Sequence, residues 1–384
     1  MTFSRNSLVA GCAVVAGCAP TPPAVPGPAC TSLCEGQIVA LDTGFGSTCA
    51  VYETGALYCW GARRGVVEDI YPNRPSCCGY PIRGPVDPVR VPLADRVVQV
   101  SLGLDYSCAV SDDGDPWCWG AGVGPSGTTR LEPIQRSSWR PTVYVSVGSS
   151  SSCEVYADGG MLCGGDLESR FFDTMGPDDA VAAANGILLA CALASDGHIE
   201  CAGNNAYGDV GDGTTELRRV PTRVLGIDDA VEIAAHGFAC ARLRSGRVKC
   251  WGPGSLGDGT SGGSSVPVEV LGVENAIQID VGFYGAYALL TDGTVMAWGD
   301  VGALVHGDGD PTARSPGVYT TPVPVDGIDD AVYLTANGDT ACVLRSNGEV
   351  WCWGNAGFGQ RAVPFETPRW PPTRALGLPC PCTL

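Results

Sequence analysis

Cysteine is the residue type in this sequence with the greatest capacity for chemistry. The chain of 384 residues contains 20 cysteines, and a thiol can form a disulfide, hold a metal ion or act as a nucleophile. Zinc sites need closely spaced Cys and His ligands, but the dominant cysteine spacing is long and the three histidines, His198, His236 and His306, are scattered. So many cysteines without a metal-binding pattern indicate disulfides and an oxidising compartment. We therefore expect no metal and no cofactor.

Sequence signatures of catalysis are absent. The chain has no Gly-x-Ser-x-Gly elbow, no phosphate-binding loop and no paired-histidine motif. The Gly-Asp-Gly segments at 211–213, 257–259 and 307–309 lack the regular carboxylate spacing of calcium loops, and turn chemistry explains them. His236 stands beside a glycine and fits a loop better than a catalytic base. We expect no catalytic residue and a protein that is not an enzyme.

Twelve of the cysteines form six pairs whose members stand ten positions apart. The midpoint of each pair is Asp, Asn, Ser or Thr, and the next residue is always Gly. This pattern is typical of a three-residue hairpin loop, in which a type I turn is followed by a left-handed Gly. Counting back from the loop places the two cysteines opposite each other at a non-hydrogen-bonded pair, within disulfide reach. The predicted disulfides are Cys49/Cys59, Cys108/Cys118, Cys153/Cys163, Cys191/Cys201, Cys240/Cys250 and Cys342/Cys352.

The cysteine pairs belong to a unit that occurs seven times. The copies are residues 41–61, 100–120, 146–165, 183–203, 232–252, 279–299 and 334–354. In the sixth copy Tyr287 and Ala297 take the two cysteine positions, while Asp292 and Gly293 keep the turn. Both cysteines are missing together, as expected if they bond to each other.

Each copy supplies four short strands. Two lie in the cysteine hairpin, and two lie around a Leu-Gly-Ile or Leu-Gly-Val turn such as the one within 220–237. The chain contains 54 Gly and 29 Pro and only 17% charged residues, a composition that favours short strands joined by tight turns. Four strands per repeat are typical of a propeller blade. We predict an all-β, seven-bladed β-propeller of four-stranded blades over residues 36–384.

A tryptophan follows the second cysteine position in five copies. Side chains alternate along a strand, so this tryptophan points to the opposite face from the cysteine. We expect it to pack against the neighbouring blade rather than form a ligand-stacking ring. Gly164 and Ala202 replace it in the third and fourth copies. The five tryptophans are Trp60, Trp119, Trp251, Trp298 and Trp353.

The end of the chain indicates how the ring closes. Residues 372–378 repeat the pattern of Pro221–Ile227, a segment that precedes a copy. We therefore expect the C-terminal strand to complete the blade that the N-terminus begins, which removes two open sheet edges. One or two further disulfides would clasp this ring, between Cys30 and Cys34 on one side and Cys380 and Cys382 on the other. Cys77 and Cys78 remain, and the pairing among these six cysteines stays open.

The first 17 residues read as an export signal. A short apolar run from Ser7 to Gly17 follows Arg5, and it is too short to span a membrane. The run ends at Cys18 in Val-Ala-Gly-Cys, which resembles the lipobox of bacterial lipoproteins, where the cysteine is lipidated. Residues 18–35 form a Pro-rich tether. We expect an exported protein of the bacterial cell envelope, an outer-membrane lipoprotein or otherwise a secreted protein.

Cysteine parity bears on this leader. Lipidation of Cys18 removes Cys12 with the signal and leaves 18 cysteines, an even number, whereas lipidation of Cys12 leaves one thiol unpaired. Ordinary signal cleavage between Cys18 and Cys30 gives the same even number, so lipidation and plain secretion both remain open.

The charge of the chain limits its partners. The net charge is −18 and the isoelectric point about 4.4, whereas phosphate backbones are held by basic surfaces. We expect no nucleic-acid partner, membrane contact only through the N-terminal lipid, and a monomer.

The motifs together resemble a known family. The fourth copy shows them in order, as Cys191–Leu193, Asp196–Gly197, Cys201–Asn205 and then Gly208–Thr214. They closely resemble the regulator of chromosome condensation repeat family, over about residues 36–380. The resemblance implies a seven-bladed propeller. The founding member is a nuclear nucleotide-exchange factor that binds chromatin, but its exchange wedge and basic tail have no counterpart motif in this sequence.

Variable loops are where such a scaffold carries function. Exposed aromatic and Arg side chains are typical interface anchors, with ordinary loop packing as the alternative for each of them. In the insertion 62–93 and in the loop near residue 138, the candidate partner-binding residues are Tyr71, Arg74, Tyr80, Arg83, Arg136, Trp139 and Arg140.

The predicted function is a non-catalytic, lipid-anchored extracytoplasmic scaffold that binds an unidentified protein or envelope polymer. Two alternatives remain. An enzyme hosted in the central channel would be supported by acidic or His residues clustered on one rim. A guanine-nucleotide-exchange-type regulator would follow from family analogy.

Overall fold

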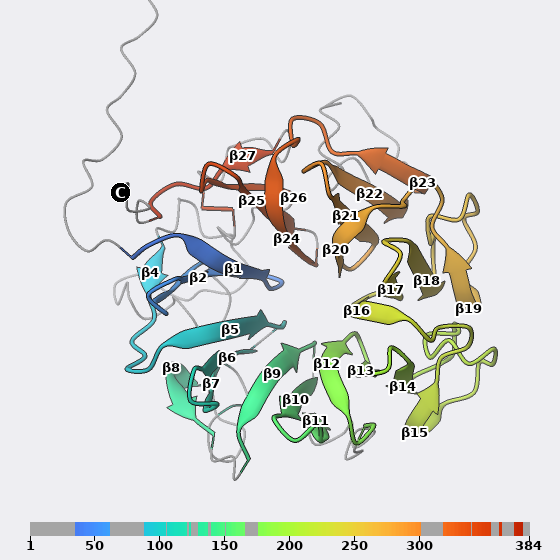
Figure 1. Ribbon diagram of the computed structural model, residues 1–384, viewed down its shortest axis with the longest axis horizontal. Helices are drawn as coiled ribbons and strands as arrows, with labels where there is room; N and C mark the ends of the chain where they lie inside the picture. Colours follow the sequence, from blue (N-terminus) through green and yellow to red (C-terminus); the bar gives the residue numbers. More distant parts are fainter. Residues whose placement is uncertain are drawn as a thin grey trace, which may run out of the picture. The chain divides into compact units, whose positions relative to one another are not determined.

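Seven antiparallel sheets make up the computed structural model, and we number them as blades 1 to 7 in chain order (Figure 1). The described residues contain no helix. They are residues 35–61, 88–104, 106–120, 123, 130–136, 140–149, 151–165, 176–300, 318–338, 340–354, 361–362 and 372–378.

Within each blade the strands are added outward in chain order, starting from the first strand. The strands of blades 1 and 2 are β1 (Ile38–Thr43), β2 (Ser47–Tyr52), β3 (Leu57–Gly61), β4 (Val89–Arg90), β5 (Val97–Leu102), β6 (Tyr106–Ser111), β7 (Pro116–Gly120) and β8 (Arg130–Gln135). Blade 3, in the part described, has β9 (Thr142–Val147), β10 (Ser151–Tyr156) and β11 (Met161–Gly165). Those of blades 4 and 5 are β12 (Ala180–Asn185), β13 (Leu189–Ala194), β14 (Ile199–Gly203), β15 (Arg218–Arg223), β16 (Ala230–Ala235), β17 (Ala239–Leu243), β18 (Val248–Gly252) and β19 (Ser264–Glu269). Those of blades 6 and 7 are β20 (Ala276–Val281), β21 (Gly285–Leu290), β22 (Val295–Asp300), β23 (Val318–Pro324), β24 (Ala331–Asn337), β25 (Thr340–Arg345), β26 (Val350–Gly354) and β27 (Thr373–Arg374).

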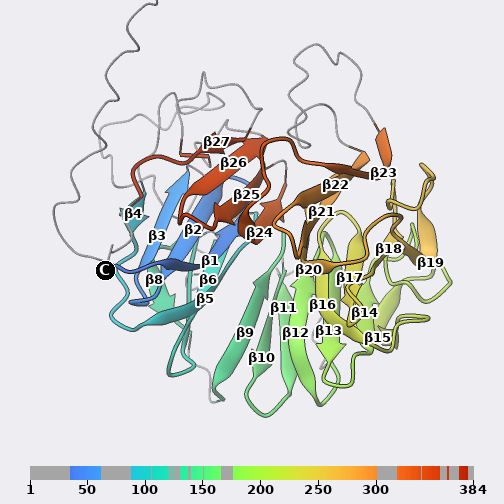
Figure 2. The ribbon, with the colours of Figure 1, turned by 45° about the horizontal axis from the view of Figure 1, so that its top comes forward.

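The first strands of the blades form the inner wall of a closed ring. Each first strand contacts the first strand of the next blade, and β1 contacts β24. Figure 2 shows β5, β9 and β12 side by side along this wall. The all-β, seven-bladed propeller predicted from the repeats is confirmed.

The two ends of the chain meet, but they do not share a blade. β27 pairs with β26 as the outer strand of blade 7, and β1 pairs with β2 at the start of blade 1. The blade built from both ends that we expected is therefore not formed by the described strands. The Leu-Gly turn joins two blades rather than two strands of one blade: β15 lies before Leu225 in blade 4, and β16 follows it in blade 5. The cysteines proposed to clasp the ring, and Cys77 and Cys78, lie outside the described residues.

The cysteine hairpins have the predicted geometry. In blade 1 the N–H of Tyr52 donates to the carbonyl of Ala56 (2.9 Å), and Cys49 stands opposite Cys59. Turn glycines in all seven blades have φ between 81° and 95°. Six disulfides form within hairpins, each with a Cα–Cα distance of 4.0 to 4.1 Å: Cys49–Cys59, Cys108–Cys118, Cys153–Cys163, Cys191–Cys201, Cys240–Cys250 and Cys342–Cys352.

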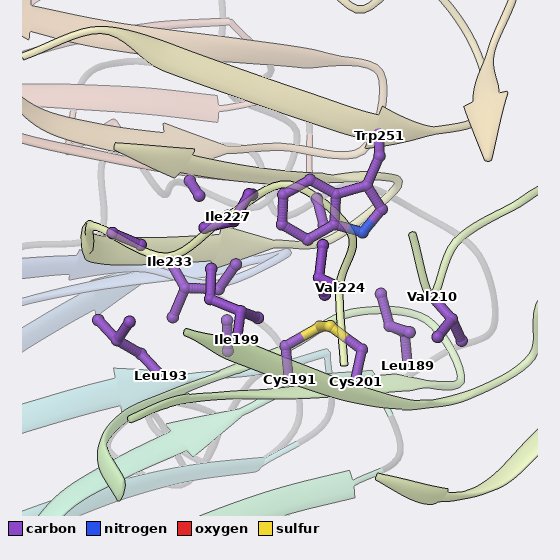
Figure 3. Close-up of a cluster of buried hydrophobic side chains, with 14 of the residues drawn as sticks. Leu189, Cys191, Leu193, Ile199, Cys201, Val210, Val224, Ile227, Ile233 and Trp251 are labelled. Carbon is purple, nitrogen blue, oxygen red and sulfur yellow. A yellow bond between two sulfur atoms is a disulfide. The ribbon is translucent and has the colours of Figure 1, made fainter. Parts of the chain in front are cut away.

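Each disulfide lies on the blade face that packs against the next blade. The disulfide Cys191–Cys201 of blade 4 shares one buried cluster with Trp251 of blade 5, and Val224 lies between them (Figure 3). The indole N–H of Trp251 donates to the carbonyl of Asp209 in blade 4 (2.9 Å). Since the five tryptophans are at most 1% exposed, the predicted packing between blades is confirmed.

The sixth blade replaces the disulfide with an aromatic contact. Tyr287 and Ala297 stand opposite each other in the cysteine positions. The Tyr287 ring meets the indole of Trp353 from blade 7 edge to face, with centroids 5.8 Å apart. An edge-to-face pair of this kind is favourable beyond its area burial, so the junction between blades 6 and 7 keeps a packed centre without a sulfur bridge.

The turn glycine also joins neighbouring blades. The carbonyl of Gly55 in blade 1 accepts a hydrogen bond from Val97 of blade 2 (3.0 Å). A Cβ at Gly55 would stand 2.7 Å from the Cα of Arg96. The position therefore requires glycine both for its positive φ and for the close approach of the next blade.

Replacement of this glycine should destabilise the ring. Gly226 offers a matched control, because it also has positive φ (65°) but a Cβ there would meet open space. We expect Gly226→Ala to lower the free energy of unfolding by about 1 kcal/mol through backbone strain alone. Gly55→Ala should lower it by about 3 kcal/mol because the clash adds to the strain. Urea denaturation under non-reducing conditions measures both, and equal losses would contradict the close approach.

Candidate functional site

Polar side chains recur at two positions of the inner wall. The third residues of the first strands are partly buried, the fifth residues are partly or fully buried, and both alternate with apolar residues that pack between blades. At the third position stand Gln99, Tyr144, Glu232, Gln278 and Tyr333; at the fifth stand Asp42, Ser101, Ser146, Asp280 and Thr335.

The two glutamines at the third position bond to the open backbone edge of the next blade. Nε2 of Gln99 donates to the carbonyl of Val145 (2.9 Å), and its Oε1 accepts from the N–H of Val145 (3.1 Å). Gln278 makes the same pair of bonds with Leu334 (2.7 and 2.9 Å). An innermost strand has no partner strand on its channel side, so these amides satisfy backbone groups that a sheet would otherwise pair.

Side chains at the fifth position do the same with single bonds. Asp42 accepts from the N–H of Leu102 (2.6 Å), and Asp280 accepts from the N–H of Ala336 (2.7 Å). The hydroxyl of Thr335 donates to Asp42 (3.1 Å), which ties blade 7 to blade 1. Hydroxyl oxygens accept in two further junctions, Ser101 from Val147 and Ser146 from Asn185, and in the junction of blades 7 and 1 Thr335 also accepts from Thr43.

Burial shifts the acid–base properties of this wall. It raises the pKa of Asp42 to about 8, with a further contribution from the charge of Asp280, and it raises the pKa of Asp280 to about 7. Both side chains keep some contact with solvent, but protein surrounds them. Burial also raises the pKa of Glu232, which the guanidinium of Arg242 opposes from 2.6 Å. The wall thus holds protons that carboxyl groups normally release below neutral pH.

The polar side chains of the inner wall form hydrogen bonds between neighbouring blades. A general acid or base must reach a substrate with a free oxygen, but the oxygens of Asp42 and Asp280 accept bonds from the backbone. No group of three or more His, Cys, Asp or Glu side chains among the described residues could hold a metal ion. His198 pairs with Asp196 in a hairpin turn, and burial lowers the pKa of His236 to about 4.

The free energy of unfolding should fall as the pH rises from about 4 to about 8. Asp42 and Asp280 hold their protons more tightly in the folded chain than in the unfolded chain, where a carboxyl pKa is about 4. Their contribution is therefore fully present below pH 4 and is lost as the pH rises through about 7 and about 8. Urea titrations at about pH 5 and about pH 8 measure the difference.

A matched pair of variants isolates this contribution. Asp280→Asn should flatten the fall, because an amide does not titrate. Asp292→Asn should leave it unchanged, because Asp292 lies in an exposed turn and has a lowered pKa, owing to bonds from Thr294. A wild-type free energy that stays level over this pH range would contradict the protonated pair.

Two of the proposed partner-binding residues fall within the described part of the chain. Arg136 and Arg140 both lie in the connection between β8 and β9. Arg136 is exposed and forms an ion pair with Glu154 (3.8 Å). Arg140 pairs with Asp158, and its guanidinium lies over the ring of Tyr156 at 4.4 Å. The others, Tyr71, Arg74, Tyr80, Arg83 and Trp139, lie outside the described residues, as does Cys18.

An exposed apolar surface escaped the sequence analysis. Ile187, Leu188 and Tyr284 are exposed in loops between the first and second strands of blades 4 and 6. Blade 5 connects them, because Ile187 donates to the carbonyl of His236 (3.1 Å) and the His236 ring lies 5.4 Å from that of Phe283. We call these five residues the loop patch. The sequence did contain a signal for this surface. Two apolar residues follow Gly186 and Gly282, whereas two serines stand at the same place in the third copy.

Backbone strain marks one residue of the loop patch. Leu188 has φ of 61°, a left-handed conformation that is uncommon for a bulky side chain and costs roughly 1 to 2 kcal/mol. The side chain is 38% exposed, so burial does not compensate for this cost. Strain of this kind tends to collect at functional sites.

Comparison with known proteins supports the fold. Residues 332–360 match the family model described as regulator of chromosome condensation (RCC1) repeat. Human WBSCR16 is similar in structure, with a TM-score of 0.70 and 19% identity over 83% of this chain and 93% of that one. Prp20p from Saccharomyces cerevisiae, whose structure was reported with its binding to Gsp1p and histones, has a TM-score of 0.62 and 17% identity over 78% and 80%.

A further similar structure comes from a plant. The CRINKLY WD40 ectodomain of the Arabidopsis thaliana receptor kinase ACR4 has a TM-score of 0.52 and 18% identity, over 86% of this chain and 100% of that one. At such identities the likeness concerns the fold alone. Among the residues described, no helix is long and apolar enough to cross a membrane.

Proposed function

We propose that this propeller, in which residues 332–360 match the RCC1 repeat model, is a non-catalytic binding scaffold held outside the cytoplasm by an N-terminal lipid. A propeller of this family supports a binding or regulatory role. The proposal goes further in three respects: the compartment, the lipid anchor and the lack of catalysis. Each of them has its own support.

The loop patch is the observation that carries the binding role. It places exposed apolar side chains from blades 4 and 6 on either side of the buried His236 of blade 5, and Tyr284 is 53% exposed. Exposed apolar side chains that gather on one face are typical of protein interaction sites, and tyrosine is enriched among interface hot spots. The strained Leu188 within it is hard to explain by stability alone.

The disulfides support a location outside the cytoplasm. Six blades carry one each, and every described cystine is almost fully buried between blades. Disulfides persist in oxidising compartments and are rare where thiols are kept reduced. The export signal and the lipobox ending at Cys18 agree with this location.

The hydrogen bonding of the inner wall supports a non-catalytic role. Three acidic side chains do gather there, as a channel-hosted enzyme would require. However, Asp42 and Asp280 accept backbone N–H groups and Glu232 pairs with Arg242. For the exchange-factor alternative, Prp20p supplies a relative by fold, but no described residue favours nucleotide exchange over other binding.

Partner binding should depend on the loop patch. Affinity purification of the mature protein from envelope extracts should recover a partner, and Tyr284→Ser should reduce its recovery at least tenfold because hot-spot residues carry most of the binding energy. Leu188→Asn should reduce recovery as well, without loss of thermal stability, because Asn tolerates left-handed backbone.

Val220 supplies the control for these variants. It is an exposed apolar residue on the outer strand β15 (63%), away from the loop patch, and Val220→Thr should bind like the wild type. Full recovery of the partner by Tyr284→Ser would overturn the assignment of the patch.

The anchor has a separate test. Cys18→Ser should move the protein from the membrane fraction to the soluble extracytoplasmic fraction and remove lipid labelling, while the six hairpin disulfides form as before, because the lipid is the only proposed membrane contact. Fractionation and mass spectrometry of the N-terminal peptide measure this. A variant that stays with the membrane, or a wild type cleaved after Cys18, would contradict lipidation.

A further inference from the structure

Every blade has a β-bulge at the same place in its first strand. In each blade the register shifts around the second residue of that strand, which is left without a partner in the second strand. A bulge turns a side chain away from the regular alternation of a strand. The bulge residues are Val39, Val98, Val143, Val181, Val231, Ile277 and Val332.

All seven bulge residues are apolar and β-branched although they contact solvent. Six of them are 45 to 52% exposed, and Val231 is partly buried. Strand propensity alone favours Thr as well as Val and Ile, so it does not explain an apolar residue in all seven blades. The first strands surround the channel, and these residues therefore form a circle that we call the bulge ring.

The bulge ring lies at the hairpin-turn end of the propeller. In six junctions the residue just before the bulge residue donates its N–H to the turn glycine of the preceding blade, for example Val97 to Gly55 (3.0 Å) and Ala180 to Gly159 (2.8 Å). The loop patch belongs to the turns at the other end of the first strands. The two surfaces are thus on opposite faces of the ring.

Carboxylates dominate part of the hairpin-turn face. In blades 2 to 4 the basic residues of the described turns and of the connections to the following blades are Arg136, Arg140 and His198. Arg96 and Arg223, just outside these segments, form ion pairs with Asp112 and Asp228. The exposed carboxylates of the same segments, which we call the acidic sector, are Asp112, Asp113, Asp158, Asp178, Asp179, Asp196, Asp228 and Asp229. Such an excess creates a negative potential that attracts cations and repels anions.

This combination restricts the occupant of the face. A second copy of the chain would bring like charges together, and a nucleic acid or an anionic lipid would meet the same repulsion. An apolar ring beside a negative surface complements a chain that is positive and carries apolar side chains. We propose that the bulge ring and the acidic sector form a docking surface for a basic protein segment with apolar side chains.

The two parts of the surface have distinct roles. Burial of the half-exposed Val143 and Val181 against the apolar side chains of the partner supplies affinity. The surrounding carboxylates accelerate association and make it sensitive to salt. This inference deepens the proposed function by adding a second surface and its partner class to the scaffold.

A defined peptide tests the surface. The probe is a labelled peptide of alternating Lys and Leu, with a Lys/Ser peptide and a Glu/Leu peptide as matched controls, measured by fluorescence polarisation with the purified mature protein. We expect the Lys/Leu peptide to bind more tightly at low salt and at least tenfold more tightly than either control. The double variant V143T/V181T should weaken binding at least tenfold, because Thr keeps the shape and strand propensity of Val but not its apolar surface.

Two further variants separate the possible results. Val220→Thr should bind the peptide like the wild type, and Asp178→Asn with Asp179→Asn should remove much of the salt dependence. Unchanged binding by V143T/V181T, or no preference for the Lys/Leu peptide, would overturn the docking surface. The proposed function is tested separately, by the effect of Tyr284→Ser on partner recovery, so either of these two results would leave it standing. Full partner recovery by Tyr284→Ser would overturn the loop patch but not the bulge ring.

Discussion

The contact between the cysteine face of one blade and the tryptophan face of the next is the interaction on which this ring depends. Seven buried clusters contain residues of two neighbouring blades each, and a disulfide or its substitute lies in every one of them. The cystine fixes the hairpin that presents it, and in four junctions the indole of the next blade packs in the same buried cluster. Because the ring is closed, each blade is held from both sides, and the clusters need not be identical. Tyr287 in place of a cystine and Ala202 in place of a tryptophan are tolerated within this arrangement.

A second layer of hydrogen bonds joins the blades at the channel. Polar side chains at the third and fifth positions of the first strands pair with the backbone edge of the following blade. The buried carboxyl groups Asp42 and Asp280 are part of this layer and keep their protons near neutral pH. Because these side chains of the inner wall bond to neighbouring blades, we propose that partners bind to the two faces of the ring. The loop patch and the bulge ring lie on opposite faces.

The sequence predicted the features that depend on residues close together in the chain. The ten-residue cysteine spacing and the glycine after its midpoint specified the turn, the register and the disulfide, all without knowledge of the ring. The Leu-Gly turn misled us because a turn between strands looks the same whether it joins one blade or two, and only strand pairing in space decides. The sequence also could not predict that Asp42 accepts a hydrogen bond from the backbone of Leu102, because Leu102 lies in another blade. The bulge ring depends on register shifts that the repeat pattern does not reveal.

Peptide mapping by mass spectrometry under non-reducing conditions tests the central claim most directly. Digestion of the native protein should release six linked peptides, each joining the two cysteines of one hairpin, from Cys49–Cys59 to Cys342–Cys352. A bond from Cys49 or any other of these twelve cysteines to a residue outside its own hairpin would contradict it, because the cystine of each blade would then not face the next blade as described.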